Sequence, residues 1–256
     1  MSELKQTIRI NKAIASSGIT SRRKADELIK HGKVKVNGKI ITELGYKVSD
    51  SDEIEISGRK IQKNQNKYLV FYKPAGCITT RNDELGRKTI FNYLPLKYHD
   101  LKPVGRLDRE TEGLLILTND GNYINNVLHP RYKIKKTYEV IIEERLDKNQ
   151  INEVSKKFLE GVIIDGTLCK ADSINHKTRQ KSSQMKQTTF EVVIHQGKNR
   201  QIRRMFQIFG FYVKALKRIE IGSFNLQNLK KGQFTELDRN SAYALFEEEN
   251  NNIHPK

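Results

Sequence analysis

The sequence predicts an α+β protein with a small basic N-terminal domain and a larger domain on a mainly antiparallel, mixed β-sheet. Segments of strand type outnumber helices in the larger part, and too few crossover helices are present for a doubly wound parallel sheet. A polar, charged stretch near residue 60 lacks apolar periodicity, as linkers do. We therefore expect a domain at 1–60, a linker at 61–67, a second domain at 68–246 and a flexible tail at 247–256.

Composition narrows the class of partner. The chain has 256 residues, with 47 Lys+Arg against 30 Asp+Glu and a formal net charge of +17. A field of this sign favours a polyanion such as nucleic acid. No apolar run approaches the length of about 20 residues that a membrane span needs, and the first residues lack the apolar core of a secretion signal. We expect a cytoplasmic protein that does not bind membranes.

Metal ligands are sparse. Cys77 and Cys169 form no cysteine-rich pattern, and the six histidines are scattered without ligand spacing. We therefore expect no metal cofactor, although magnesium held by carboxylates alone remains open at this point.

In the first domain, local signals predict two helices and a hairpin. Residues 9–18 carry one apolar helical face and end at Gly18, and residues 19–32 form a second helix with Thr20 or Ser21 as N-cap. Alternating valines then lead into Asn37-Gly38, a strong hairpin signal. Residues 52–57 give a further alternating strand.

The second of these helices has a basic first turn. This turn contains Arg22, Arg23 and Lys24, and the helix dipole disfavours each cation there by a few tenths of a kcal/mol. A solvated basic face would explain one such cation. Three together in a basic domain favour contact with phosphates.

The second domain alternates strands and helices. Strands are predicted from apolar or alternating runs and helices from 3.6-residue spacing. The segments are a strand at 68–72, a strand at 114–118, a helix within 122–129, strands at 136–142 and 188–195, and a helix within 198–210. The basic insertion at 176–187 is equally compatible with an RNA-contacting loop and with a solvated hairpin tip.

The helix within 198–210 is the most regular. Its apolar stripe has i, i+3, i+4, i+7 spacing and consists of Ile202, Met205, Phe206 and Phe209, with Gly210 at its end. The opposite face is basic and polar, and consists of Arg200, Arg203, Arg204 and Gln207.

Asp108 is the leading candidate for a reactive group. It stands between Arg106 and Arg109, immediately before an apolar strand, where loops on a rigid scaffold carry chemistry. An exposed ion pair, worth only ~0–1 kcal/mol, is the structural alternative. A further alternative uses Asp108 with Glu110 and Glu112 to hold magnesium in a nuclease.

A resemblance adds to this interpretation of the first domain. Residues 9–39 read RINKAIASSGITSRRKADELIKHGKVKVNGK and closely resemble the RNA-binding domain named after ribosomal protein S-four, the alpha-L motif. The resemblance implies that Lys12, Arg22, Arg23 and Lys24 face a structured RNA and position the protein while reading little sequence.

The second domain resembles the RsuA/RluB branch of pseudouridine synthases. The resemblance rests on four segments in order: YLVFYKPAGCITT, GRLDRETEGLLILTNDG, LHPRYKIKKTYEV and GKNRQIRRMFQIFG. It implies that Asp108 is the catalytic aspartate, that Arg203 pairs with it, and that Tyr138 stacks on the target base. It further implies that Arg106 fills the gap left by a flipped base and that Lys73-Pro74 shapes the pocket wall. We also assign Arg200 and Arg204 to RNA contact.

The resemblance also implies a substrate class. Within the branch the chain is most similar to the RluB type, which acts on 23S ribosomal RNA, free or in a large-subunit assembly intermediate. The reaction is an isomerisation, so we expect no cofactor, and we expect a monomer. RluF-type or RsuA-type synthases with other target uridines, and a non-catalytic RNA-binding assembly factor, are the alternatives.

Overall fold

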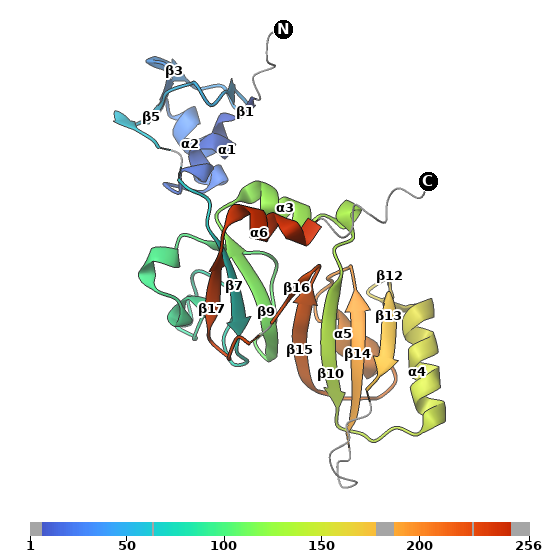
Figure 1. Cartoon of the computed structure of the whole chain (residues 1–256). Coiled ribbons are helices and arrows are strands. Elements are labelled where there is room, and N and C mark those ends of the chain that lie inside the picture. The colour runs from blue at the N-terminus through green and yellow to red at the C-terminus, as the bar shows by residue number, and fades with distance from the viewer. Residues whose placement is uncertain (1–6, 63, 178–186, 227, 247–256) are drawn as a thin grey trace. The chain divides into compact units, whose positions relative to one another are not determined.

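The chain divides into two units (Figure 1), and each has its own hydrophobic core. The first comprises Met1–Asn66 with Asn119–Gly121, and the second comprises Lys67–Thr118 with Asn122–Lys256. The computed structural model describes residues 7–246 except 63, 178–186 and 227. The expected tail and most of the basic insertion at 176–187 therefore lie outside the described residues.

The first unit combines two helices with short strands. Its four-stranded sheet has the order β3-β2-β5-β6, and β1 pairs with β4. The elements are β1 (Ile8–Arg9), α1 (Ile10–Ser16), α2 (Arg22–Lys30), β2 (Val34–Val36), β3 (Lys39–Ile41), β4 (Lys47–Val48), β5 (Ile54–Ile56) and β6 (Arg59–Lys60). The predicted helices, hairpin and strand are confirmed, whereas β1, β4 and β6 were not predicted.

Local chemistry explains these boundaries. The hydroxyl of Ser21 accepts a hydrogen bond from the backbone N–H of Lys24, so Ser21 is the N-cap of α2. Asn37 and Gly38 both have positive φ, at 50° and 79°, as a two-residue hairpin turn requires. The helices and sheet enclose a core that includes Ile14 and Ile29, both with no exposed surface.

The stretch expected to be a linker is partly ordered in the sheet. Ile61, the first residue of that stretch, directly follows the β5–β6 ladder, and its backbone N–H donates to the carbonyl of Ile54 at 2.9 Å. Ile61 also packs against the core of the first unit. Ile61 therefore belongs to the first unit, because its backbone and side chain are both tied to it.

The second unit is built on one large sheet. Its strands follow the order β13-β14-β10-β15-β9-β7-β17, with β8 on β9 and β16 on β15. They are β7 (Tyr68–Lys73), β8 (Lys102–Pro103), β9 (Thr111–Thr118), β10 (Lys136–Ile142), β13 (Ser173–His176), β14 (Thr188–Ile194), β15 (Val213–Ile221), β16 (Phe224–Asn225) and β17 (Phe234–Leu237). Neighbours run antiparallel except β9 and β15, which are parallel, so the predicted mainly antiparallel mixed sheet is confirmed.

Helices and a small hairpin surround this sheet. They are η1 (Ile90–Tyr93), η2 (Leu96–Tyr98), α3 (Gly121–Leu128), η3 (Pro130–Tyr132), α4 (Lys148–Glu160), β11 (Val162–Ile164), β12 (Thr167–Cys169), α5 (Gln201–Ile208), α6 (Arg239–Tyr243) and η4 (Ala244–Phe246). Helix α4 was not predicted. It begins at a capping box, in which Asp147 and Gln150 exchange side-chain-to-backbone hydrogen bonds.

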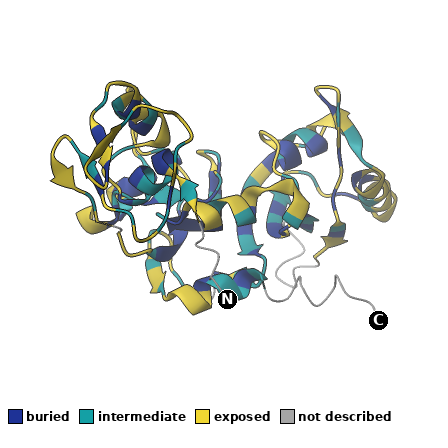
Figure 2. Ribbon diagram, turned by 90° about the horizontal axis from the view of Figure 1, so that it is seen from above, coloured by how far each residue is buried: buried dark blue, intermediate teal, exposed yellow. Residues whose placement is uncertain are grey.

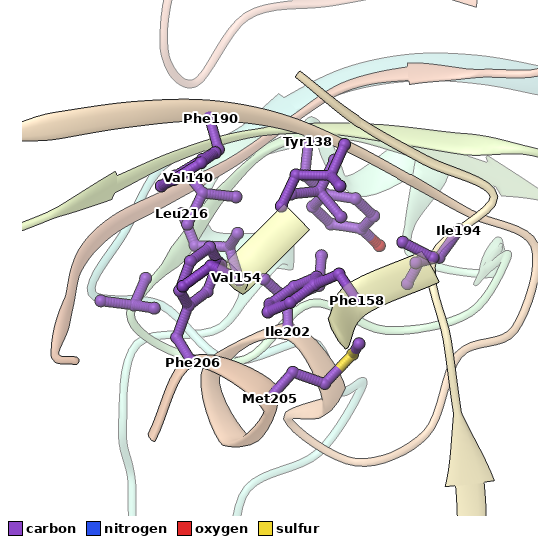
Figure 3. Packing of buried hydrophobic residues seen from close by; sticks show 14 of the residues in the cluster. Tyr138, Val140, Val154, Phe158, Phe190, Ile194, Ile202, Met205, Phe206 and Leu216 are labelled. Atoms are coloured by element: carbon purple, nitrogen blue, oxygen red, sulfur yellow. The ribbon is translucent and has the colours of Figure 1, made fainter. Parts of the chain in front are cut away.

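Helix α5 packs on the part of the sheet that contains β10 and β14. Its predicted apolar stripe is confirmed: Ile202, Met205 and Phe206 are buried, and Phe209 is partly buried against the same core. Figure 3 shows Phe206 among Phe158 and Phe190, with ring centroids 4.6 and 5.4 Å away. In Figure 2 buried, intermediate and exposed residues follow one another along the helix ribbons, as expected when one helical face packs on a core. This packing fixes the loop that precedes α5.

Candidate active site

Asp108 lies in the turn between β8 and β9, and this turn is held from both sides. The buried Leu107 is bonded to Thr79, whose hydroxyl donates to the Leu107 carbonyl at 2.7 Å and accepts from its N–H at 3.3 Å. On the other side, the N–H of Thr111 donates to the Asp108 carbonyl at 3.1 Å. The backbone of Asp108 is therefore fixed, while its side chain is 31% exposed.

A buried lysine holds the turn from below. The ammonium of Lys73, which has no exposed surface, donates to the carbonyls of Thr111 at 2.8 Å and Asp108 at 3.1 Å. Burial lowers the pKa of Lys73, and the nearby acidic groups of Cys77 and Asp108 oppose that shift. Lys73 is not among the residues that line the cavity, so the expectation that it shapes the pocket wall is wrong.

A cavity of about 460 Å³ opens beside this turn. The turn of Asp108, strands β10 and β15, and the loop before α5 supply its walls. Among the predicted site residues, those that line it are Arg106, Asp108, Tyr138 and Arg200. Arg106 is exposed, and Tyr138 is 8% exposed and packed against the core of Figure 3. Four residues from three distant segments therefore meet at one cavity.

Among the described arginines, Arg200 is the one whose guanidinium lies within 4 Å of the Asp108 carboxylate. Its Nη1 lies 3.9 Å from Asp108 Oδ2 and 3.5 Å from Glu110 Oε2. Arg203 instead donates to the carbonyls of Val213 at 2.8 Å and Glu110 at 3.4 Å. The expected Asp108–Arg203 ion pair is therefore absent among the described contacts, because two carbonyls hold the Arg203 guanidinium.

Arg203 is nevertheless close enough for the charges of Asp108 and Glu110 to affect its pKa. Burial lowers its pKa first, the charge of Arg200 lowers it further, and Asp108 and Glu110 counteract both effects. Its role in catalysis stays a prediction, and in this structure it supports the turn through the Glu110 backbone.

Arg204 contacts another partner. It forms two hydrogen bonds of 2.6 Å with the carboxylate of Asp165, in the turn between β11 and β12, and does not line the cavity. This bonding lowers the pKa of Asp165. Arg204 therefore lies outside the cavity lining, and its contact with RNA stays a prediction.

Arg218 is a site residue that the sequence analysis missed. It pairs with Tyr138 across β10 and β15, lines the cavity, and is only 4% exposed. Its Nε donates to the Leu114 carbonyl at 2.8 Å, and its Nη1 lies 3.5 Å from the Tyr138 hydroxyl. The available signal was its place on the same strand face as the buried Leu216.

The three carboxylates considered for magnesium have separate partners. Asp108 and Glu110 approach Arg200, whereas Glu112 accepts from the Tyr72 hydroxyl at 3.2 Å and pairs with Lys231 at 2.7 Å. Within the described part of the chain, no three His, Cys, Asp or Glu residues are grouped as metal ligands. The geometry therefore does not favour the nuclease alternative.

In the first unit, α1 and α2 present the predicted basic residues. The first turn of α2 exposes Arg22, Arg23 and Lys24. This first turn contains no acidic residue. Lys12 is half-buried on α1. Asn11 joins the helices: it donates to Asp26 at 2.9 Å and accepts from Arg22 at 3.4 Å. The cations thus stand on a fixed helix pair.

Comparison with known protein families defines the class of this protein. Residues 67–208 match the family model of RNA pseudouridylate synthases, and residues 8–54 match the S4 domain. The chain belongs to the RNA pseudouridylate synthase family.

Individual relatives cover nearly the whole chain. It is 42% identical to ribosomal large subunit pseudouridine synthase B of Bacillus subtilis, over 90% of this chain and 91% of the relative. It is 38% identical to an uncharacterized RNA pseudouridine synthase of Aquifex aeolicus, over 93% and 94%. A crystal structure of a pseudouridylate synthase superimposes with a TM-score of 0.63 at 26% identity, covering 93% of this chain and 99% of that one.

No helix in the described part of the chain is both long and apolar enough to cross a membrane.

Proposed function

We propose that this protein converts a specific uridine of 23S ribosomal RNA to pseudouridine, with Asp108 as the catalytic group. The placement of Asp108 carries the proposal: its backbone is fixed and its carboxylate lies at a cavity shared with Tyr138, Arg106 and Arg200. The relative from Bacillus subtilis, named for the large ribosomal subunit, supports this class of RNA.

The reaction is balanced without a cofactor. The N1–C1′ bond of the nucleotide breaks, the base turns, and C5 bonds to C1′. C5 loses a proton and N1 gains one. Because nothing is oxidised or reduced, we propose that the protein needs no cofactor. We further propose that it acts as a monomer in the cytoplasm, on free RNA or on an assembly intermediate.

The target base must leave the RNA stack before N1 and C5 can reach protein groups. Arg106 is exposed beside the cavity, where it can occupy the space left by the flipped base. Tyr138 offers a ring for stacking, and the carboxylate of Asp108, beside Arg200, is the nucleophile or base. Arg200 thereby takes the role first expected of Arg203, and Arg203 supports the turn through the Glu110 carbonyl.

The basic residues of α2 support binding to a structured RNA. Arg22, Arg23 and Lys24 are exposed and gathered on one turn. We propose that they bind phosphates, with Lys12 on the neighbouring helix, and so position the protein while reading little sequence.

Tritium release tests the proposal. The protein is incubated with unmodified 23S rRNA that carries tritium at uridine C5, with and without EDTA. We expect release in both cases without strand cleavage, and complete loss in Asp108→Asn. Glu110→Gln is the matched control, because it neutralises the other carboxylate at Arg200 and should retain most activity. Release by Asp108→Asn would overturn the assignment.

A further inference from the structure

Arg218 places a positive charge at the wall of the cavity, and this charge has no acidic partner among the described residues. The side chain is 4% exposed, and within the described residues no carboxylate lies within 4.0 Å of its guanidinium. Its contacts are neutral: the Leu114 carbonyl and the Tyr138 hydroxyl. A buried cation without a counter-charge is costly, and an anion bound beside it would offset that cost.

The guanidinium also has unused hydrogen-bonding capacity. Its Nη2 is buried with no hydrogen-bond partner, as is the hydroxyl oxygen of Thr111. Both residues line the cavity and belong to the parallel strands β15 and β9, where Thr111 pairs with Leu216 and Gly113 pairs with Arg218. Two residues that line the cavity therefore keep unused hydrogen-bonding capacity.

The backbone around Arg218 is fixed as well. Gly113 lies so close to it that a Cβ there would stand 2.1 Å from the Arg218 carbonyl oxygen. On the other side, β15 pairs with β10 at Tyr138. Because strands on both sides hold Arg218, its charge is preorganised and needs little rearrangement during a reaction.

The proposed reaction creates a negative charge at such a cavity. When the N1–C1′ bond breaks, both electrons of the bond leave with the base, which becomes a uracil anion delocalised over N1, O2 and O4. This holds whether Asp108 bonds to C1′ or removes the C2′ proton as a C1′–C2′ double bond forms. The anion then bonds through C5 to C1′.

We propose that Arg218 is a positioning residue that fixes the Tyr138 hydroxyl and stabilises the detached uracil anion through its uncompensated charge. This inference rests on the proposed function. It predicts that the arginine accelerates bond cleavage and contributes little to RNA affinity.

The test varies the leaving group. Arg218→Gln is compared with the unaltered protein in single-turnover reactions on two RNAs, with uridine or 5-fluorouridine at the target position. Digests to nucleosides are separated by reversed-phase chromatography and detected by mass spectrometry, which follows loss of the N1-linked nucleoside by retention time, because the isomers have equal mass. Fluorine stabilises the uracil anion, so cleavage of this RNA depends less on Arg218. We expect a rate loss of about 100-fold on uridine RNA, a clearly smaller loss on fluorinated RNA, and unchanged RNA affinity.

Lys217→Gln is the matched control. Lys217 is the neighbouring cation on the other face of β15, with its ammonium 5.3 Å from the Tyr72 ring centroid, and its loss should leave the rate nearly unchanged. Equal losses on both RNAs, or a loss of affinity alone, would overturn the inference. If Arg218→Gln does not fold, Arg218→Lys, whose ammonium cannot span the same contacts, is subjected to the same comparison. Inactivity of the unaltered protein would overturn the proposed function instead.

Discussion

Single residues hold this site together through backbone contacts more than through ion pairs. Lys73 donates to carbonyls of the Asp108 turn, Thr79 fixes Leu107, and Arg203 donates to the carbonyl of Glu110. These bonds leave the Asp108 carboxylate available, with Arg200 as the one arginine of the described chain within 4 Å of it. The turn is therefore rigid while its reactive group stays free for substrate.

Gly113 is the most constrained of the glycines in the second unit. Its φ is 117°, and an added Cβ would meet the backbone of Arg218. We expect Gly113→Ala to lower the free energy of unfolding by about 3 kcal/mol or more, because neither backbone can retreat from a sheet ladder. Chemical denaturation measures this.

Gly121→Ala is the control for that substitution. Nothing lies within 4 Å of a Cβ at Gly121, and its φ is not in the left-handed region. We expect little change or slight stabilisation, since alanine favours the helix α3. Equal destabilisation by both substitutions would contradict the role given to the close approach.

For single residues, the sequence predicted where a residue stands in the fold better than which side chains it contacts. Asp108 was predicted to stand directly before an apolar strand, and that placement depends on nearby residues only. The Asp108–Arg203 pair was wrong, because the carbonyls of Val213 and Glu110 hold the Arg203 side chain. Arg218 was missed because its significance depends on Tyr138, some 80 residues away in the chain.

Among the elements, α5 and α2 were predictable from periodicity. A strict apolar stripe defines α5, and Ser21 with its cap defines α2. Helix α4 shows the limit: its capping box at Asp147 was readable, but most of its surface is polar, so the apolar signal was weak. The parallel pairing of β9 with β15 could not be predicted, because the residues of neither strand indicate which strand it pairs with.

Helix α2 yields a prediction about RNA binding. Replacing Arg22 and Arg23 together by glutamate should weaken binding to 23S rRNA and reduce the slope of log affinity against log salt by about 1 to 2. The reason is that exposed cations at phosphates release counter-ions on binding. Titrations at several salt concentrations give the slope.

A second pair of basic residues, at and just after the C-terminal end of α2, is the control. Lys30 and Lys33 are exposed at the far end of α2, and their joint replacement by glutamate changes the net charge equally. We expect a smaller change in slope. Equal effects of the two pairs would mean that only net charge matters, and would contradict specific phosphate contact by the first turn.

At the scale of the whole molecule, the two units have separate hydrophobic cores. The core of the first includes Ile29, and that of the second includes Phe158. We expect calorimetry to show two unfolding transitions, because burial in one core does not stabilise the other. Ile29→Ala should lower one midpoint only and Phe158→Ala the other only, each by removing about 2–5 kcal/mol. A single transition shifted by both substitutions would contradict this.

The parallel contact between β9 and β15 sets when activity can begin. Thr111 follows Asp108 closely, yet its strand partner Leu216 comes more than a hundred residues later. Pairings between such distant segments form slowly and late. During synthesis the Asp108 turn emerges long before the strand that completes its cavity. The nascent chain can therefore gain its RNA-binding unit first and its chemistry last, so binding and catalysis are acquired in that order in the life of each molecule.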